Sequence, residues 1–186
     1  MKNLALCIAI AAFLPCQGQA ENKTLRILVV AAGRALSDRE VQLQAFVQDP
    51  TPFRKSASLS LSGPDFDRQL ETSLVHALIL EDARLSSGEK MAEQAGEAKE
   101  FLSLRNRATA KVWADFLQKH EVTELELRQR LRQRLYVESL LEARVRLSLV
   151  GQSDLKAAQK QALADKAIED WVSQLKSRYR VQRLEK

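Results

Sequence analysis

Cysteine, proline and glycine are all scarce in this 186-residue chain, and each shortage excludes a class of structure. The only cysteines are Cys7 and Cys16, at the extreme N-terminal end. If that end is a leader, the mature chain has no disulfide, no thiolate metal ligand and no cysteine nucleophile. No proline follows Pro64, and there are only six glycines. Because both residue types disfavour helix interiors, their scarcity favours a mainly helical fold.

The first twenty residues have the pattern of a secretory signal peptide. Lys2 is followed by the apolar run LALCIAIAAFL at 4–14, and Gly18 and Ala20 are the small residues that a signal peptidase needs. The run is too short to span a bilayer of about 30 Å as a helix. We therefore predict cleavage near Ala20, export to the periplasm and a mature domain over 21–186.

Cys16 and the net charge bear on lipidation and on binding to lipid or nucleic acid. Cys16 raises the question of lipidation, but Pro15 precedes it where a lipidation signal needs a small residue. The full chain carries a formal net charge of +5, and its acidic and basic residues are interleaved. That balance predicts no nucleic-acid binding, and at most a peripheral attraction to anionic lipid.

Apolar residues recur at helical spacing through most of the mature chain, which predicts about five helices. Two of them begin at capping boxes, Ser37 with Glu40 and Thr123 with Glu126. The stretch 51–64 is interpreted as a loop, with a short edge strand as the alternative. The predicted helices cover about 38–48, 65–85, 89–119, 124–149 and, after a break at 151–154, the segment that ends near 178.

Two β-rich segments flank these helices, LRILVVAA at 25–32 and YRVQRL at 179–184. Because isolated strands are unstable, the simplest arrangement pairs the two ends of the mature chain against the helices. The predicted fold is therefore mainly α, with about five helices and a small two-stranded sheet of N- and C-terminal strands. Exchange of those strands between protomers would instead give a homodimer.

The order of these segments resembles the SurA N-terminal-like domain of periplasmic chaperones, which is often joined to parvulin isomerase domains. The resemblance covers most of the mature chain in order, although Ala32 stands where the family usually has Asn. The matching segments are VVAAG at 29–33, LSDRE at 36–40, HALILEDA at 76–83, VTELELRQRLRQRLYVESL at 122–140 and WVSQLKSRYRV at 171–181.

This resemblance implies an ATP-independent periplasmic chaperone that binds unfolded outer-membrane or other exported polypeptides. The clients would lie in an apolar groove between helices, with low side-chain specificity. No stretch remains for a parvulin domain, so the resemblance implies the chaperone module alone, with no cofactor.

The residues themselves offer no catalytic constellation, so we predict that the protein is not an enzyme. His76 and His120 are interpreted as structural, and the phenylalanines and tryptophans at helical spacing as core. The arginine run 128–134 is interpreted as a solvated helix face. Apolar residues in the 51–64 loop and beside the stripe of the fourth helix are the candidates for client contact. They are Phe53, Leu59, Leu61 and Tyr136.

Two other functions remain open at this stage. The chain could be a non-catalytic interaction subunit of an envelope complex, such as the partner of a separate parvulin isomerase. It could also be an amphipathic protein of the membrane surface, which would sediment with anionic liposomes in a salt-dependent way.

Overall fold

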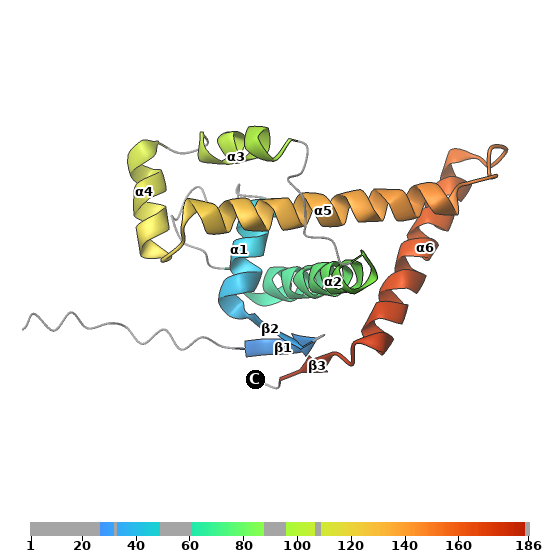
Figure 1. The fold of residues 1–186 in the computed structure, drawn as a ribbon, viewed down its shortest axis with the longest axis horizontal. Coiled ribbons are helices and arrows are strands. Elements are labelled where there is room, and N and C mark those ends of the chain that lie inside the picture. Colours follow the sequence, from blue (N-terminus) through green and yellow to red (C-terminus); the bar gives the residue numbers. More distant parts are fainter. Residues whose placement is uncertain (1–26, 32, 49–60, 88–95, 107–108, 185–186) are drawn as a thin grey trace, which may run out of the picture.

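A computed structural model describes residues 27–31, 33–48, 61–87, 96–106 and 109–184. Within these ranges the chain forms six helices and one three-stranded antiparallel sheet, so the predicted mainly α class is confirmed (Figure 1). In chain order the elements are β1 (Ile27–Ala31), β2 (Arg34–Ser37), α1 (Asp38–Gln48), α2 (Gly63–Ser87), α3 (Glu97–Arg105), α4 (Ala110–Lys119), α5 (Glu124–Ser148), α6 (Ala157–Arg178) and β3 (Gln182–Arg183).

The sheet joins the two ends of the described chain, as the sequence predicts. Val29 of β1 lies opposite Arg183 of β3. The pairing continues past β3, because the backbone N–H of Leu184 donates to the carbonyl of Leu28 at 2.9 Å. Both strands of this pairing belong to the same chain, so the terminal strands close the fold of the single chain.

The third strand, β2, corrects the prediction of a two-stranded sheet. Gly33 has a φ of 74°, in the left-handed region that favours glycine, and the chain then returns along β1 as a hairpin. A four-residue strand that runs directly into a helix cap has too little alternation to be recognised.

Local capping signals place the starts of α1 and α5 where they were predicted. The backbone N–H of Glu40 donates to Ser37 Oγ at 3.2 Å, and the N–H of Ser37 donates to Glu40 Oε2 at 3.0 Å, which completes a capping box. At α5, Thr123 Oγ1 accepts from the N–H of Glu126 at 3.1 Å.

The predicted single helix over 89–119 is wrong where the structure describes it, because two helices occupy 97–119. Asn106 ends α3, and Thr109 begins α4 with an extended backbone while its Oγ1 accepts from the N–H of Val112 at 3.4 Å. Asn and Thr are weak helix formers that favour helix ends, which explains the break. The predicted stripe still converges, since Phe101, Trp113 and Phe116 are all buried together.

The buried residues form two groups on either side of α1. The first core cluster joins α1, α3, α4 and the start of α5. The sheet-side cluster joins β1, α2, Val137 and the end of α6. The large members of the first are Leu43, Phe46, Phe101, Leu104, Trp113, Phe116, Leu127 and Leu131. Those of the second are Leu28, Val29, Val41, Leu74, Leu78, Ile79, Val137 and Leu175.

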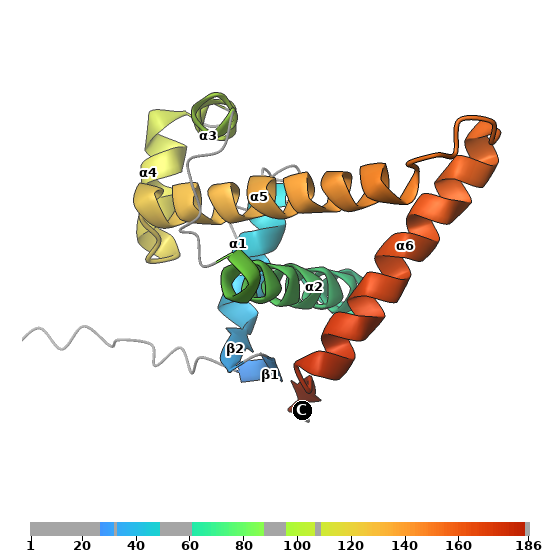
Figure 2. The ribbon, with the colours of Figure 1, turned by 45° about the vertical axis from the view of Figure 1, so that its right-hand side comes forward.

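Helices α5 and α6 extend beyond both clusters. Figures 1 and 2 show α5 running outward to a connecting turn, from which α6 slants back to the sheet. The base of α6 is fastened to α2 by Lys176 with Glu71, and by Arg178 and Tyr179 with Asp82. Among the described helices, none is both long enough and apolar enough to cross a bilayer.

Candidate functional site

Of the four predicted client contacts, two lie within the described residues. Leu61 precedes α2 and packs, half-buried, against the first core cluster. Tyr136 is half-buried near the middle of α5. Phe53 and Leu59 lie outside the described residues, as does most of the 51–64 segment. A role in client binding stays a prediction for all four.

The structure points to a different surface, which sequence reasoning missed. We define the arm as residues 138–174, which comprise the distal half of α5, the connecting turn and most of α6. Between Val137 and Leu175, Ala164 is the only buried residue. The two helices therefore pack against the sheet-side cluster at the base of the arm and bury only Ala164 beyond it.

The arm carries many large apolar side chains that water still reaches. Leu147 is 69% exposed and Val150 is 73% exposed, and both lie near the tip. A hollow of about 250 Å³ lies beside them, lined by Arg144, Leu147 and Ser148 of α5 and by Ala167 of α6. The half-buried apolar residues of the arm are Leu140, Leu141, Val145, Leu149, Leu155, Leu163, Ile168, Trp171 and Val172. Of these, Leu140, Leu141 and Trp171 pack against the sheet-side cluster.

Trp171 lies where the arm meets the sheet-side cluster. Its helical spacing predicts core packing, and the half-buried ring packs against the sheet-side cluster while the guanidinium of Arg144 lies 5.6 Å from its centroid. Periodicity identifies an apolar face but does not say what covers it. The available signal was the apolar group Leu147, Leu149 and Val150 immediately before Gly151, at a helix end where a turn leaves side chains uncovered.

The arginine run on α5 corrects another interpretation, because most of it is not a solvated face. Arg132 donates to both carboxylate oxygens of the buried Glu97, at 2.7 and 3.1 Å. Arg134 donates to the carbonyl of Val47 at 2.9 Å and pairs with Glu100. Arg128 is exposed, with its guanidinium 4.3 Å from the ring centroid of Phe101. These arginines hold α1 and α3 against the proximal half of α5.

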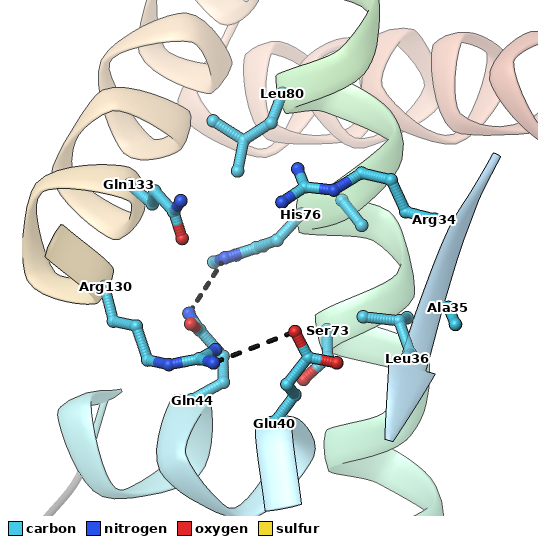
Figure 3. A pocket seen from close by; sticks show the side chains of 11 residues that line it. Arg34, Ala35, Leu36, Glu40, Gln44, Ser73, His76, Leu80, Arg130 and Gln133 are labelled. Atoms are coloured by element: carbon cyan, nitrogen blue, oxygen red, sulfur yellow. Dashed lines mark hydrogen bonds and ion pairs between the residues drawn. The ribbon is translucent and has the colours of Figure 1, made fainter. Parts of the chain in front are cut away.

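A polar pocket lies between β2, α1, α2 and α5 (Figure 3). Its volume is about 50 Å³. His76 of α2 points into it and lies 3.2 Å from Gln44, between Nδ1 of the ring and Nε2 of the amide. Burial, together with the positive charge of Arg134, lowers the pKa of His76 from 6.5 to about 4. The imidazole is therefore neutral at pH 7.

Arg130 forms one wall of this pocket and has only loose partners. Its Nη2 lies 3.7 Å from Glu40 Oε1 and 3.6 Å from Glu126 Oε1, beyond hydrogen-bonding distance. Its Nε is buried without a hydrogen-bond partner, and so is the hydroxyl of Ser73 in the same pocket.

The second histidine, His120, caps the C-terminal end of α4, where the sequence places it. Its ring centroid lies 5.0 Å from that of Phe116. Within the described ranges, no three or more histidine, cysteine, aspartate or glutamate side chains gather as a metal site would require.

With the arm and the polar pocket described, the chain can be set against known proteins. Comparison with protein-family models, with curated proteins and with solved structures finds no match in any of the three.

Proposed function

We propose that the mature chain is an ATP-independent periplasmic chaperone that binds unfolded outer-membrane or other exported polypeptides along the arm. The observation that carries this proposal is the exposure of Leu147 and Val150 on a two-helix extension that encloses no core. Export rests on the signal-peptide pattern of residues 1–20, and the client class on the resemblance to SurA-type chaperones.

The physical driving force would be burial of apolar surface shared by the arm and the client. Removing apolar surface from water contributes about 25 cal/mol per Å² and depends little on which apolar side chain is buried. An extended client must lose chain entropy on binding, so only part of this gain appears as affinity. Weak and unspecific binding is what a carrier of many sequences requires.

The charges of the arm favour a polypeptide over an anionic lipid surface. Residues 138–174 include five basic and six acidic residues, so the two signs nearly cancel. An amphipathic element that binds anionic membranes usually has an excess of lysine and arginine on its polar face. Binding through the arm should therefore be insensitive to salt, whereas electrostatic adsorption to lipid would weaken as salt rises.

The direct test is suppression of aggregation of a urea-unfolded outer-membrane protein diluted into buffer without ATP. The mature protein should slow aggregation, and the double variant Leu147→Asp with Val150→Asp should weaken client binding about tenfold, because it places charges where apolar contact is needed. The matched control is Leu125→Asp, since Leu125 is 65% exposed on α5 but lies outside the arm.

Several outcomes would contradict the proposal. One is that the mature protein has no effect at several-fold excess over the client. Another is that the arm variant and the Leu125→Asp control lose activity equally. A stable one-to-one complex with a purified parvulin isomerase, combined with no effect on unfolded clients, would favour the interaction-subunit function instead.

A further inference from the structure

We propose that the polar pocket between β2, α1, α2 and α5 binds a carboxylate group, with Arg130 as its principal donor and Ser73 and Arg34 as supporting contacts. This site is separate from the arm, and the inference does not rest on the chaperone function. It follows from the hydrogen bonding, the charge and the size of the pocket.

The first argument is the unsatisfied hydrogen-bonding capacity at the pocket wall. The side chain of Arg130 is 17% exposed, yet both of its ion pairs exceed 3.5 Å and its buried Nε has no acceptor. Ser73 is 5% exposed, and its hydroxyl also has no partner. A buried donor left unpaired costs about 1–3 kcal/mol, so such groups call for an acceptor that completes them.

Arg130 differs from its neighbours on α5 in the terminal nitrogens of the guanidinium, since the buried Nε of Arg134 is likewise without a hydrogen-bond partner. Arg132 and Arg134, at the next two alternate positions, each donate to an acceptor within 3.0 Å. Arg130 differs because the carboxylate of Glu40, which faces it across the pocket, lies 3.7 Å away, too far for a hydrogen bond (Figure 3). A guanidinium facing a cavity is suited to a planar, two-oxygen acceptor, which it can bind through two parallel hydrogen bonds.

The charged residues that line the pocket also favour an anionic ligand. Arg34 and Arg130 line the pocket together with a single carboxylate, Glu40, and His76 is neutral at pH 7. One oxygen of Glu40 accepts from the backbone of Ser37, and the other lies 3.7 Å from Nη2 of Arg130. The lining residues therefore have one net positive charge, which favours an anion, and the planar guanidinium matches a planar carboxylate better than a tetrahedral phosphate.

The third argument is size and access. A cavity of about 50 Å³ exceeds the roughly 10–15 Å³ that one water needs, and it can hold a small planar group. It is too small for a nucleotide or a sugar. Arg34 and Ala35 of the lining are exposed, so the pocket opens to solvent at β2. The remainder of a larger ligand would lie outside this opening.

The carboxylate could belong to a free small organic acid or to the terminal carboxylate of a polypeptide. Both present the same chemistry to Arg130, and titrations followed by two-dimensional ¹H–¹⁵N NMR of the mature protein would separate them. The probes are acetate, acetamide and inorganic phosphate at pH 7 and constant ionic strength, followed by a short peptide with either a free C-terminus or a C-terminal amide.

Acetate should cause saturable shifts of the Arg130 Nε–H signal and of the backbone amides of Ser73, His76 and Gln133. Its Kd should be on the order of a millimolar, as expected for a ligand of so few atoms. Acetamide should cause none of these shifts, and phosphate should bind more weakly than acetate. A free-acid peptide that binds more tightly than both acetate and its own amide would identify a polypeptide terminus as the source. Equal affinity for peptide acid and acetate would identify a small acid.

Variants separate the site from a general effect of charge. Arg34→Gln lies at the exposed edge of the pocket, so it should fold normally and weaken acetate binding about tenfold, as expected for loss of a charged hydrogen-bond donor. Arg130→Gln should abolish binding, and Ser73→Ala offers a second test if that variant fails to fold. The matched control is Arg68→Gln on α2, an exposed arginine outside the pocket, which should leave the affinity unchanged.

The inference would be overturned if acetate produced no saturable shift at these residues, which would leave a water-filled cavity. It would also be overturned if acetamide shifted them equally, or if Arg68→Gln weakened binding as much as Arg34→Gln.

Discussion

Helix α5 passes from the core into the arm, and its two halves differ in what covers them. In the proximal half Leu127, Leu131 and Val137 are buried. In the distal half Leu141 and Val145 are half-buried, and Leu147 is exposed. The spacing of apolar residues hardly changes along the helix, so the difference comes from the elements that pack against it.

The two halves of α5 also differ in the ion pairs and hydrogen bonds that hold them to neighbouring helices. Arg132 and Arg134 bind the proximal half to α3 and α1. The distal half has α6 as its neighbour, and α6 is itself anchored at its base, through Lys176 and Arg178 on α2. Elements with few buried contacts open locally at low free energy, and binding surfaces are often drawn from them. The comparison teaches that α5 serves both as a core helix and as the support of an exposed apolar surface.

The largest expected contrast is in stability. Leu131→Ala removes a side chain that is 2% exposed in the first core cluster, and should lower the free energy of unfolding by about 4 kcal/mol. Leu141→Ala, at a half-buried position in the arm, should cost clearly less. Urea denaturation of both variants, followed by circular dichroism, measures the difference. Equal costs would mean that the arm is packed as tightly as the core.

Acidic pH should lower the free energy of unfolding through protonation of His76. Folding lowers the pKa of His76 from 6.5 to about 4. Between pH 6.5 and pH 4 the imidazole is therefore protonated in the unfolded chain and neutral in the folded chain. The contribution of His76 to the free energy of unfolding is therefore fully present above pH 6.5. Protonation of the unfolded chain lowers the free energy of unfolding by roughly 3 kcal/mol by pH 4.

His76→Gln is the variant that isolates this effect from the titration of the carboxylates. Gln has no titrating group, so its stability profile between pH 7 and pH 4 should be flatter than that of the wild type. Urea denaturation at a series of pH values gives both profiles. Parallel profiles would show that His76 is not the group responsible.

The ion pair that ties α3 to α5 should have a smaller effect. Arg132→Met leaves Glu97, which is 2% exposed, without its two hydrogen bonds. We expect a loss of about 2 kcal/mol, because a buried carboxylate loses two charge-assisted hydrogen bonds while water retains some access to it through the half-exposed position of Arg132. Arg146→Met, at an exposed position on the distal half, is the matched control for stability. If both variants unfolded at the same urea concentration, α5 would not be fastened as described.

The smallest stability effect should accompany the largest functional one. Leu147→Ala should change the free energy of unfolding by less than about 0.5 kcal/mol, since the side chain is already 69% exposed. It should nevertheless weaken binding of an unfolded outer-membrane protein, measured by fluorescence anisotropy of a labelled client. Normal client affinity in this variant would separate exposure of the arm from function.

The parts of the fold that were predictable are those specified by neighbouring residues. Capping at Ser37 and Thr123 placed two helices, and the apolar terminal segments placed the pairing of β1 with β3. The unpredicted features depend on distant partners. The arginine run 128–134 was interpreted as a solvated helix face, because nothing in its own sequence indicates that Arg132 and Arg134 contact α3 and α1. The uncovered apolar face near the tip of the arm was not recognised, because periodicity carries no information about a missing partner.

The same reasoning explains what was missed at the candidate sites. His76 was interpreted as a structural residue among leucines, and its neighbours in sequence are indeed apolar. The pocket around it is completed by Arg34, Gln44 and Arg130, which come from three other elements. A constellation built from single residues of separate segments has no local sequence pattern.

The most direct test of the arm as the client-binding surface is hydrogen–deuterium exchange along α5, with and without an unfolded outer-membrane protein. In the free protein, amides of 127–137 should exchange more slowly than those of 140–148. Saturation with client should slow exchange across 138–174 and leave α3 and α4 unchanged. Slowing confined to α3 and α4, or no slowing anywhere in the arm, would contradict the account.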